Sequence, residues 1–379
     1  MRFLRRFFQV LLLAACVLEI SARLLIPANA PFLQYPRRST NPFVRSEWTP
    51  NYRGRINING IGGQKGSYEL SINPFGFRGR SMQASQKPAN TIRIFFQGGS
   101  LVESLAMPED KTLSALVEQR LSASVPEQRF ECLNAGLSGF MAADMLAQFQ
   151  YQIMDYNPDI LIITATAVND LRYGTVPEYD PVHHTGLQKS EDAYSLFQQL
   201  TRHSRFFFTF LRLASRLYQE WFPYTQALEN YQRQYRRIPK TKMAASRALP
   251  DFENCLSRLI RLAKNRHVRV LLTSEPSIYQ TPLPPEIENR LWMGLMRRNI
   301  NLSPTFLEQE TRRFNKAAEM LAKENDAEWI DLAAQIPKTL ENFYDDMHLT
   351  PVGSTRVAEV IFHNLLKIKQ PMPLKTEGL

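Results

Sequence analysis

The sequence predicts an α/β/α sandwich built around a central, parallel five-stranded sheet. From residue 91 onward, short apolar runs alternate with longer segments in which apolar residues recur at helical spacing. The alternation repeats about five times, and this order of elements is typical of a parallel sheet that is covered by helices on both faces.

The expected strands are short apolar runs bounded by turn-forming residues. The run at 160–163 is apolar at every position, as a central strand that is buried on both faces should be. The full set of expected strands lies at 92–96, 130–133, 160–163, 268–272 and near 329–330.

The expected helices follow these strands and carry recognisable start signals. The last helix begins with Thr350 as its cap and Pro351 in the first turn, where proline is well tolerated. The other main helices are expected after an Asp110 cap, at 141–156 before a proline, after an Asp251 cap and around 306–323.

The chain divides into three parts. Residues 1–30 are expected to form a signal-anchor segment, residues 31–90 an irregular juxtamembrane arm, and residues 91–379 the α/β domain. The arm is rich in Pro, Asn, Arg and Gly and lacks a sustained apolar period. An insertion at about 175–250 is too long for an ordinary loop, so we expect it to have structure of its own.

The N-terminus indicates export, because three arginines within the first six residues precede an apolar run at 7–20. Three outcomes remain open: an uncleaved single-pass anchor, cleavage at Ala28-Asn29-Ala30, or lipidation at Cys16. Each of them places the body of the protein outside the cytoplasm. With an uncleaved anchor, we expect a single-pass protein of the bacterial inner membrane whose main domain faces the periplasm.

Within the insertion, residues 202–222 mix aromatic side chains with arginines. One interpretation is a lid, or a helix lying on the membrane surface near the anchor, where basic and aromatic residues are favoured. The other interpretation is a helix that packs its aromatic side chains on the main domain and leaves its arginines in solvent. The sequence does not decide between them.

Composition and short motifs exclude several classes of function. The net charge is +10, because the chain has 46 Lys and Arg residues and 36 Asp and Glu residues. An excess of basic residues alone does not identify the class of binding partner. The chain has no zinc-finger spacing, Walker loop or RNA-binding signature, so we expect no nucleic acid. The three cysteines are widely spaced, and His183-His184 lack acidic or cysteine partners at ligand spacing. We therefore expect no metal and no other cofactor.

Three candidate catalytic positions follow the ends of the first three predicted strands. Ser100 follows Gly98-Gly99, which allow a sharp turn, so its hydroxyl is placed to act as a nucleophile. Gly136 follows the second strand and Asn169 the third. The backbone N–H groups of Ser100 and Gly136, together with the amide of Asn169, are expected to stabilise a developing oxyanion.

A carboxylate and a histidine precede the last helix. Asp345 stands three residues before His348, and a tight turn at that spacing lets the carboxylate bind the imidazole Nδ1–H. Nε2 is then free to take the proton of Ser100. Asp346 is an alternative orienting residue, but the three-residue offset favours Asp345.

These four segments resemble the sequence blocks of the SGNH, or GDSL, hydrolases over roughly residues 91–367. The resemblance rests on Asn134-x-Gly136-x-Ser138-Gly139 and on Asp345-x-x-His348-Leu349-Thr350-Pro351. It implies a flavodoxin-like fold, with a serine nucleophile, an oxyanion hole, and an aspartate and histidine as orienter and base. In this chain the resemblance implies Ser100 as the nucleophile, with Gly136 and Asn169 in the oxyanion hole. It further implies Asp345 as the orienting residue and His348 as the base.

The chain departs from the family pattern at two positions and resembles one branch in particular. The first block has Gly-Gly-Ser where Gly-Asp-Ser is usual, a change that the family tolerates. Ala167 stands where the third block usually begins with glycine, and its methyl group is expected to narrow the floor of the site. The stretch at 73–79 and the N-terminal segment resemble a membrane-tethered bacterial branch of the family.

The hypothesis that follows is a serine esterase that removes O-acyl groups, such as acetyl, from a cell-envelope glycan or lipid through an acyl-enzyme on Ser100. One alternative is an O-acyltransferase of an exported polysaccharide, with its acyl group supplied by a membrane partner. Another is a catalytically silent assembly protein on the same fold. The complete set of catalytic residue types favours an enzyme.

Overall fold

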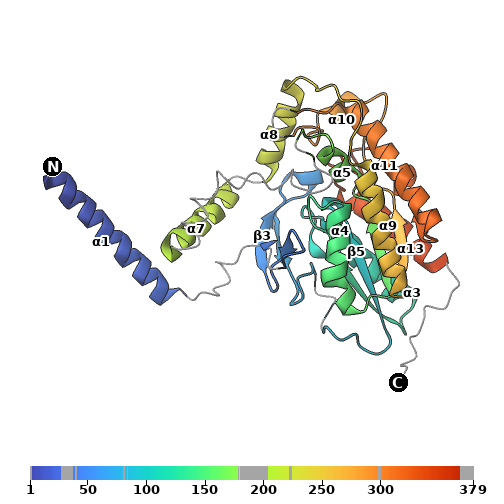
Figure 1. The fold of residues 1–379 in the computed structure, drawn as a ribbon, viewed down its shortest axis with the longest axis horizontal. Helices are drawn as coiled ribbons and strands as arrows, with labels where there is room; N and C mark the ends of the chain where they lie inside the picture. The colour runs from blue at the N-terminus through green and yellow to red at the C-terminus, as the bar shows by residue number, and fades with distance from the viewer. Residues whose placement is uncertain are drawn as a thin grey trace.

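The computed structural model describes residues 2–26, 37–38, 41–79, 82, 84–177, 179, 204–221, 224–296 and 300–367. Its main body contains a five-stranded sheet in the order β6-β5-β7-β8-β9, in which every neighbouring pair is parallel. Figure 1 labels β5, one strand of this sheet, among the helices of the main body. The five predicted strands are confirmed, with β5 at Thr91–Gln97, β6 at Arg129–Asn134, β7 at Ile160–Thr164, β8 at Arg269–Thr273 and β9 at Glu328–Ile330.

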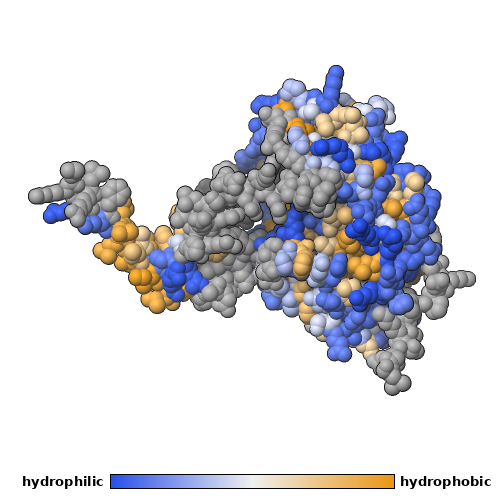
Figure 2. Space-filling model, in the orientation of Figure 1, coloured by the Kyte–Doolittle hydropathy of each residue, from blue (hydrophilic) through white to orange (hydrophobic). Residues whose placement is uncertain are grey.

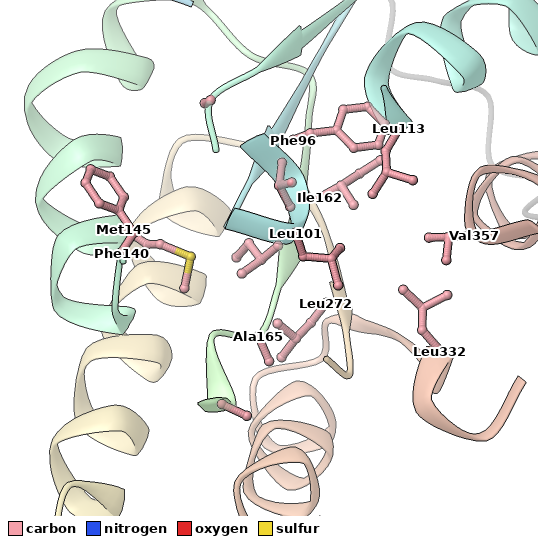
Figure 3. Close-up of a cluster of buried hydrophobic side chains, with 14 of the residues drawn as sticks. Phe96, Leu101, Leu113, Phe140, Met145, Ile162, Ala165, Leu272, Leu332 and Val357 are labelled. Atoms are coloured by element: carbon pink, nitrogen blue, oxygen red, sulfur yellow. The ribbon is translucent and has the colours of Figure 1, made fainter. Parts of the chain in front are cut away.

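Two groups of helices cover this sheet. In one group α3 (Leu113–Ser124) packs on α13 (Pro351–Lys367), and in the other α9 (Leu249–Asn265) packs on α4 (Ala142–Gln148) and on α11 (Pro304–Glu324). Figure 3 shows apolar side chains of both groups meeting the buried side chains of the strands. The shorter helices are α2 (Ser100–Glu103), α5 (Ala167–Tyr173), α10 (Pro285–Glu288) and α12 (Leu332–Gln335).

Some helix ends differ from the prediction. Thr112, not Asp110, caps α3, and Asp251 lies in the first turn of α9 instead of before it. The predicted cap of α13 is confirmed, because Thr350 Oγ1 accepts the N–H of Gly353 at 3.1 Å. The helix expected at 141–156 is α-helical only to Gln148 and then continues as a π-helical turn and a 3₁₀ turn.

The arm that we expected to be irregular contains two small antiparallel sheets. β1 (Arg37–Arg38) pairs with β2 (Glu47–Trp48), and β3 (Arg53–Asn57) pairs with β4 (Ser67–Ser71). The fully buried Arg78 docks the arm on the sandwich, because its guanidinium donates to backbone carbonyls between residues 103 and 107. The prediction was wrong here because the turn-rich composition concealed strands that have only a few residues each.

The insertion contains α7 (Arg205–Trp221) and α8 (Tyr224–Arg237). α7 lies beside the N-terminal helix α1 (Arg2–Leu25), apart from the sandwich in Figure 1. The carboxylate of Glu19 on α1 accepts the N–H groups of Arg205 and Phe206 at 2.9 and 3.1 Å, so a side chain of α1 caps α7. The aromatic part of the insertion therefore packs against α1. The first interpretation placed this segment near the N-terminal anchor, whereas the packing on the main domain expected by the second is not what α7 shows.

Apolar side chains are exposed along α1 (Figure 2). They include Val10, Leu11, Leu12, Leu13, Val17, Leu18, Ile20, Leu24 and Leu25. Within the described residues, no helix has the length and apolar character needed to cross a membrane, so the spanning anchor that we predicted at 1–30 gains no support from the structure.

Candidate active site

Ser100 stands at the carboxyl end of the buried strand β5, where the chain turns sharply into α2. The two glycines before it are needed for close packing. A Cβ on Gly98 would lie 2.6 Å from Val102 Cγ2, and a Cβ on Gly99 would lie 2.7 Å from Asn169 Nδ2. The predicted turn is therefore present, and it brings the side chain of Asn169 next to the residue before Ser100.

A continuous chain of hydrogen bonds runs from Ser100 through His348 to Asp345. His348 Nε2 lies 2.7 Å from Ser100 Oγ, and His348 Nδ1 lies 2.8 Å from Asp345 Oδ2. Asp345 is fully buried, and its Oδ1 also accepts the backbone N–H of His348 at 2.9 Å. The structure thus brings together three residues that the sequence predicted, two of them 248 residues apart.

Asp346 faces a different set of partners. It accepts the hydroxyl of Tyr279 at 2.9 Å and the backbone N–H groups of Trp292 and Met293 at 2.8 and 3.2 Å. Burial and the neighbouring charge of Asp345 raise the pKa of Asp346 to about 7. Asp346 therefore holds the segment around Trp292, and Asp345 is the aspartate that contacts the His348 ring, at the three-residue offset.

Electrostatics within this chain favour an ion pair between the histidine and the aspartate. Burial raises the pKa of Asp345, but the charge and hydrogen bonds of His348 outweigh burial and hold that pKa below its ordinary value. Burial lowers the pKa of His348, and here the carboxylate of Asp345 outweighs it, so the pKa of His348 is raised. A histidine in this setting is a stronger base toward a serine hydroxyl than a free imidazole.

Two aromatic rings lie beside His348, and the sequence reasoning assigned neither of them to the site. The rings of Trp292 and Tyr344 lie nearly parallel to the imidazole, at centroid distances of 6.4 and 5.6 Å. Trp292 also donates its indole N–H to Asp345 at 2.9 Å. Tyr344 stands beside the recognised motif, whereas nothing local to Trp292 marks it as part of the site.

Asn169 is the residue for which the sequence predicts a side-chain oxyanion donor. It lies in α5, and one N–H of its Nδ2 donates to Phe140 O at 2.9 Å. The amide can donate a second hydrogen bond from the same nitrogen. The backbone N–H of Ser100 begins α2 and has no acceptor among the described residues. The second N–H of Asn169 and the backbone N–H of Ser100 are thus both without an acceptor among the described residues.

The structure contradicts the prediction for Gly136. Its backbone N–H already donates to the side-chain oxygen of Asn134 at 3.0 Å. A Cβ on Gly136 would lie 2.4 Å from the backbone nitrogen of Glu103, so this glycine packs against α2. Glycine is required here for close packing, not for a donor that faces substrate.

Gly139, in the same loop, has the properties that we expected of Gly136. Its φ is +79°, which favours glycine, and a Cβ there would meet nothing within 4 Å. No described residue accepts a hydrogen bond from its N–H. The signal in the sequence was a second glycine in the same motif, but its positive φ and its free N–H are visible only in the fold.

The model of the GDSL-like lipase/acylhydrolase family matches residues 96–356. This chain belongs to that family. It is accordingly an enzyme that hydrolyses acyl esters. No curated protein matches the chain.

Several solved structures resemble this GDSL-family enzyme at low identity. The acetyl xylan esterase AlAXEase is 14% identical with a TM-score of 0.42, over 72% of this chain and 100% of its own. The acetylxylan esterase Axe2 from Geobacillus stearothermophilus is 14% identical with a TM-score of 0.42, over 75% and 97%. A GDSL-like lipase from Bacteroides thetaiotaomicron is 15% identical with a TM-score of 0.37, over 73% and 88%.

Ala167 and His183-His184 are the remaining residues that the sequence analysis singled out. Ala167 is fully buried at the start of α5, so its methyl group is not an exposed part of the floor of the site. His183-His184 lie outside the described residues. Among the residues that the structure does describe, no group of three or more His, Cys, Asp or Glu is placed to hold a metal ion.

Proposed function

We propose that this GDSL-family enzyme hydrolyses O-acyl esters through an acyl-enzyme on Ser100. The observation that carries the proposal is the hydrogen-bonded series of Ser100 Oγ, His348 and the buried Asp345, with distances of 2.7 and 2.8 Å. Nucleophile, base and orienting carboxylate in this order constitute a catalytic triad.

In the first half of the reaction, Ser100 Oγ attacks the carbonyl carbon of the ester while His348 Nε2 takes the hydroxyl proton. The ionised Asp345 stabilises the imidazolium that forms. The bond to the alcohol then breaks, and the alcohol leaves with the proton from His348. In the second half, water gives a proton to His348 and attacks the acyl group. The bond from the acyl carbon to Ser100 Oγ then breaks, and His348 returns the proton to Ser100 Oγ as the acid leaves.

The tetrahedral intermediate carries a negative oxygen, and three donors are assigned to it in this proposal. They are the backbone N–H of Ser100, the second N–H of Asn169 Nδ2 and the N–H of Gly139. Donors that are fixed before the reaction stabilise the developing charge without having to reorganise. Gly139 replaces Gly136 in this role because the N–H of Gly136 is already used by Asn134.

The test compares the full-length chain with Ser100→Ala on an activated acetyl ester. Ser122→Ala is the matched control, because Ser122 is exposed on α3. Wild type and Ser122→Ala should hydrolyse the ester at equal rates, and Ser100→Ala should be close to the uncatalysed rate. Equal rates for wild type and Ser100→Ala would sink the proposal. Acyl transfer to an added oligosaccharide without hydrolysis would favour the acyltransferase alternative instead.

We also propose that the enzyme acts outside the cytoplasm, on O-acyl groups of an envelope glycan or lipid. Support comes from the arginine-rich start of the chain and from the exposed apolar side chains of α1. Fractionation of cells that produce the full chain tests the location, and Cys16→Ser separates lipidation from other attachment. Recovery of wild type in the cytoplasmic fraction would contradict the proposal.

A further inference from the structure

The loop at 136–141 is held from outside the matched family region by two arginines of the arm. Arg45 Nη2 donates to Gly139 O at 2.6 Å. Its guanidinium also forms a bidentate salt bridge with Asp144, at 2.9 Å from Nε to Oδ1 and 2.7 Å from Nη2 to Oδ2. Asp144 in turn accepts the N–H of Met141 at 2.9 Å, so Arg45 spans the loop from Gly139 to the start of α4.

The second arginine, Arg37, acts through a buried carboxylate. Glu103 has no exposed surface and stands three residues after Ser100 at the end of α2. Its Oε2 accepts the backbone N–H of Ser138 at 2.9 Å and also the hydroxyl of Ser138. Its Oε1 pairs with Arg37 at 2.5 Å. A buried carboxylate needs such a partner, since an unpaired charge in the interior is strongly destabilising.

These contacts hold the backbone on both sides of the Gly139 N–H. Glu103 holds Ser138, which precedes that N–H, and Arg45 holds the carbonyl of Gly139, which follows it. Gly139 has no side chain, and its surroundings leave the Cβ position open, so local packing does not orient it. The direction of the Gly139 N–H therefore depends on its two neighbours and on the charged residues that hold them.

We propose that Arg45 and the Arg37–Glu103 pair are positioning residues that aim the Gly139 N–H at the oxyanion. The arm is then part of the catalytic unit and not only a connection from the N-terminal segment to the domain. This inference rests on the proposed esterase function. It adds that Arg37 and Arg45, which precede the family match, determine how well the transition state is stabilised.

The test measures kcat and KM of full-length Arg45→Ala and Arg45→Lys on the activated acetyl ester. Arg53→Ala is the matched control, since Arg53 is an exposed arm arginine paired with Glu69 at 2.7 Å. Loss of an oxyanion donor lowers kcat about 10²- to 10³-fold, and a displaced donor should cost part of that. We expect kcat to fall at least about tenfold in Arg45→Ala with KM nearly unchanged.

Arg45→Lys keeps the charge but cannot hold Asp144 and Gly139 O together in the same fork, so it should lie between wild type and Arg45→Ala. It is also the variant of choice if Arg45→Ala does not fold. Titration of Ser100 with a fluorophosphonate normalises each rate to folded sites, so simple unfolding does not imitate a lower kcat. Arg53→Ala should match wild type.

Two results would overturn the inference while leaving the proposed function intact. One is a wild-type kcat in folded Arg45→Ala and Arg45→Lys, which would make the arm a packing surface only. The other is a higher KM at unchanged kcat, which would make Arg45 a substrate contact. Failure of the proposed function is distinguishable from both, because Ser100→Ala would then hydrolyse the ester as fast as wild type.

Discussion

Trp292 donates its indole N–H to Asp345 Oδ2, the same oxygen that lies 2.8 Å from the His348 ring. The backbone N–H of Trp292 is held by Asp346, so two adjacent aspartates fix one tryptophan. The aspartate that orients the histidine is thus itself oriented from the side by a residue more than fifty positions earlier in the chain.

Trp292→Phe should lower kcat, because the change removes this donor while keeping an aromatic ring beside His348. A hydrogen bond to a charged group contributes about 1.5–3 kcal/mol, so a loss of about tenfold is expected if only part of it acts in the transition state. Steady-state kinetics on the activated ester measures it. Trp329→Phe, at a partly buried tryptophan of β9, is the control and should keep wild-type kcat. Equal kcat in Trp292→Phe and wild type would contradict the role of the indole.

On the acid side of the pH profile, kcat/KM should begin to fall at a pH above 6.5, the ordinary pKa of histidine. His348 accepts the serine proton only when it is neutral, and the carboxylate of Asp345 raises its pKa. Asp345→Asn removes that charge, so the acid limb of kcat/KM should move to lower pH while the rate falls by several orders of magnitude. The pH profile of kcat/KM measures both effects. An acid limb at the same pH in wild type and Asp345→Asn would refute the pairing.

The two glycines of the 136–139 loop should respond differently to alanine. Gly136→Ala places a methyl group 2.4 Å from the backbone nitrogen of Glu103, so it should lower the melting temperature strongly. Gly139→Ala meets open space and mainly strains a positive φ, at a cost of about 1–2 kcal/mol, while disturbing the donor N–H. It should lower kcat with a smaller change in melting temperature. The reverse pattern would restore Gly136 as the donor.

Asn169→Ala removes the side-chain donor beside Gly99 and should lower kcat about 10²- to 10³-fold with little change in KM. Asn169→Asp is the sharper comparison, because it keeps the shape but puts a negative charge where the oxyanion develops. We expect it to be at least as slow as Asn169→Ala. A kcat near that of wild type in both variants would remove Asn169 from the oxyanion hole.

The sheet and the hydrogen-bonded series of Ser100, His348 and Asp345 were predictable because their signals are local. Each strand is a short apolar run, and the geometry of Asp345 and His348 follows from a three-residue turn. Ser100 was predictable once the strand before it was recognised, since parallel strands carry active sites at their carboxyl ends. These features need only the pattern of a few neighbouring residues.

The parts that were missed depend on distant contacts or on backbone conformation. Arg45 contacts Asp144, which lies 99 residues later in the chain, and no sequence pattern within the arm predicts that contact. Gly136 and Gly139 are chemically identical in the sequence, and they differ only in φ and in whether the N–H is already used. The capping of α7 by Glu19 joins residues 186 positions apart, so the packing of the insertion could not be read from its own composition.

The acyl-enzyme on Ser100 is the central claim, and rapid quenching of the full-length enzyme with an activated acetyl ester tests it most directly. Mass spectrometry of the digested protein should find one acetyl group on the peptide that contains Ser100 during turnover, and none on that peptide in Ser100→Ala. Turnover of the ester by wild type with no acetyl group on Ser100 at any time point would contradict the account.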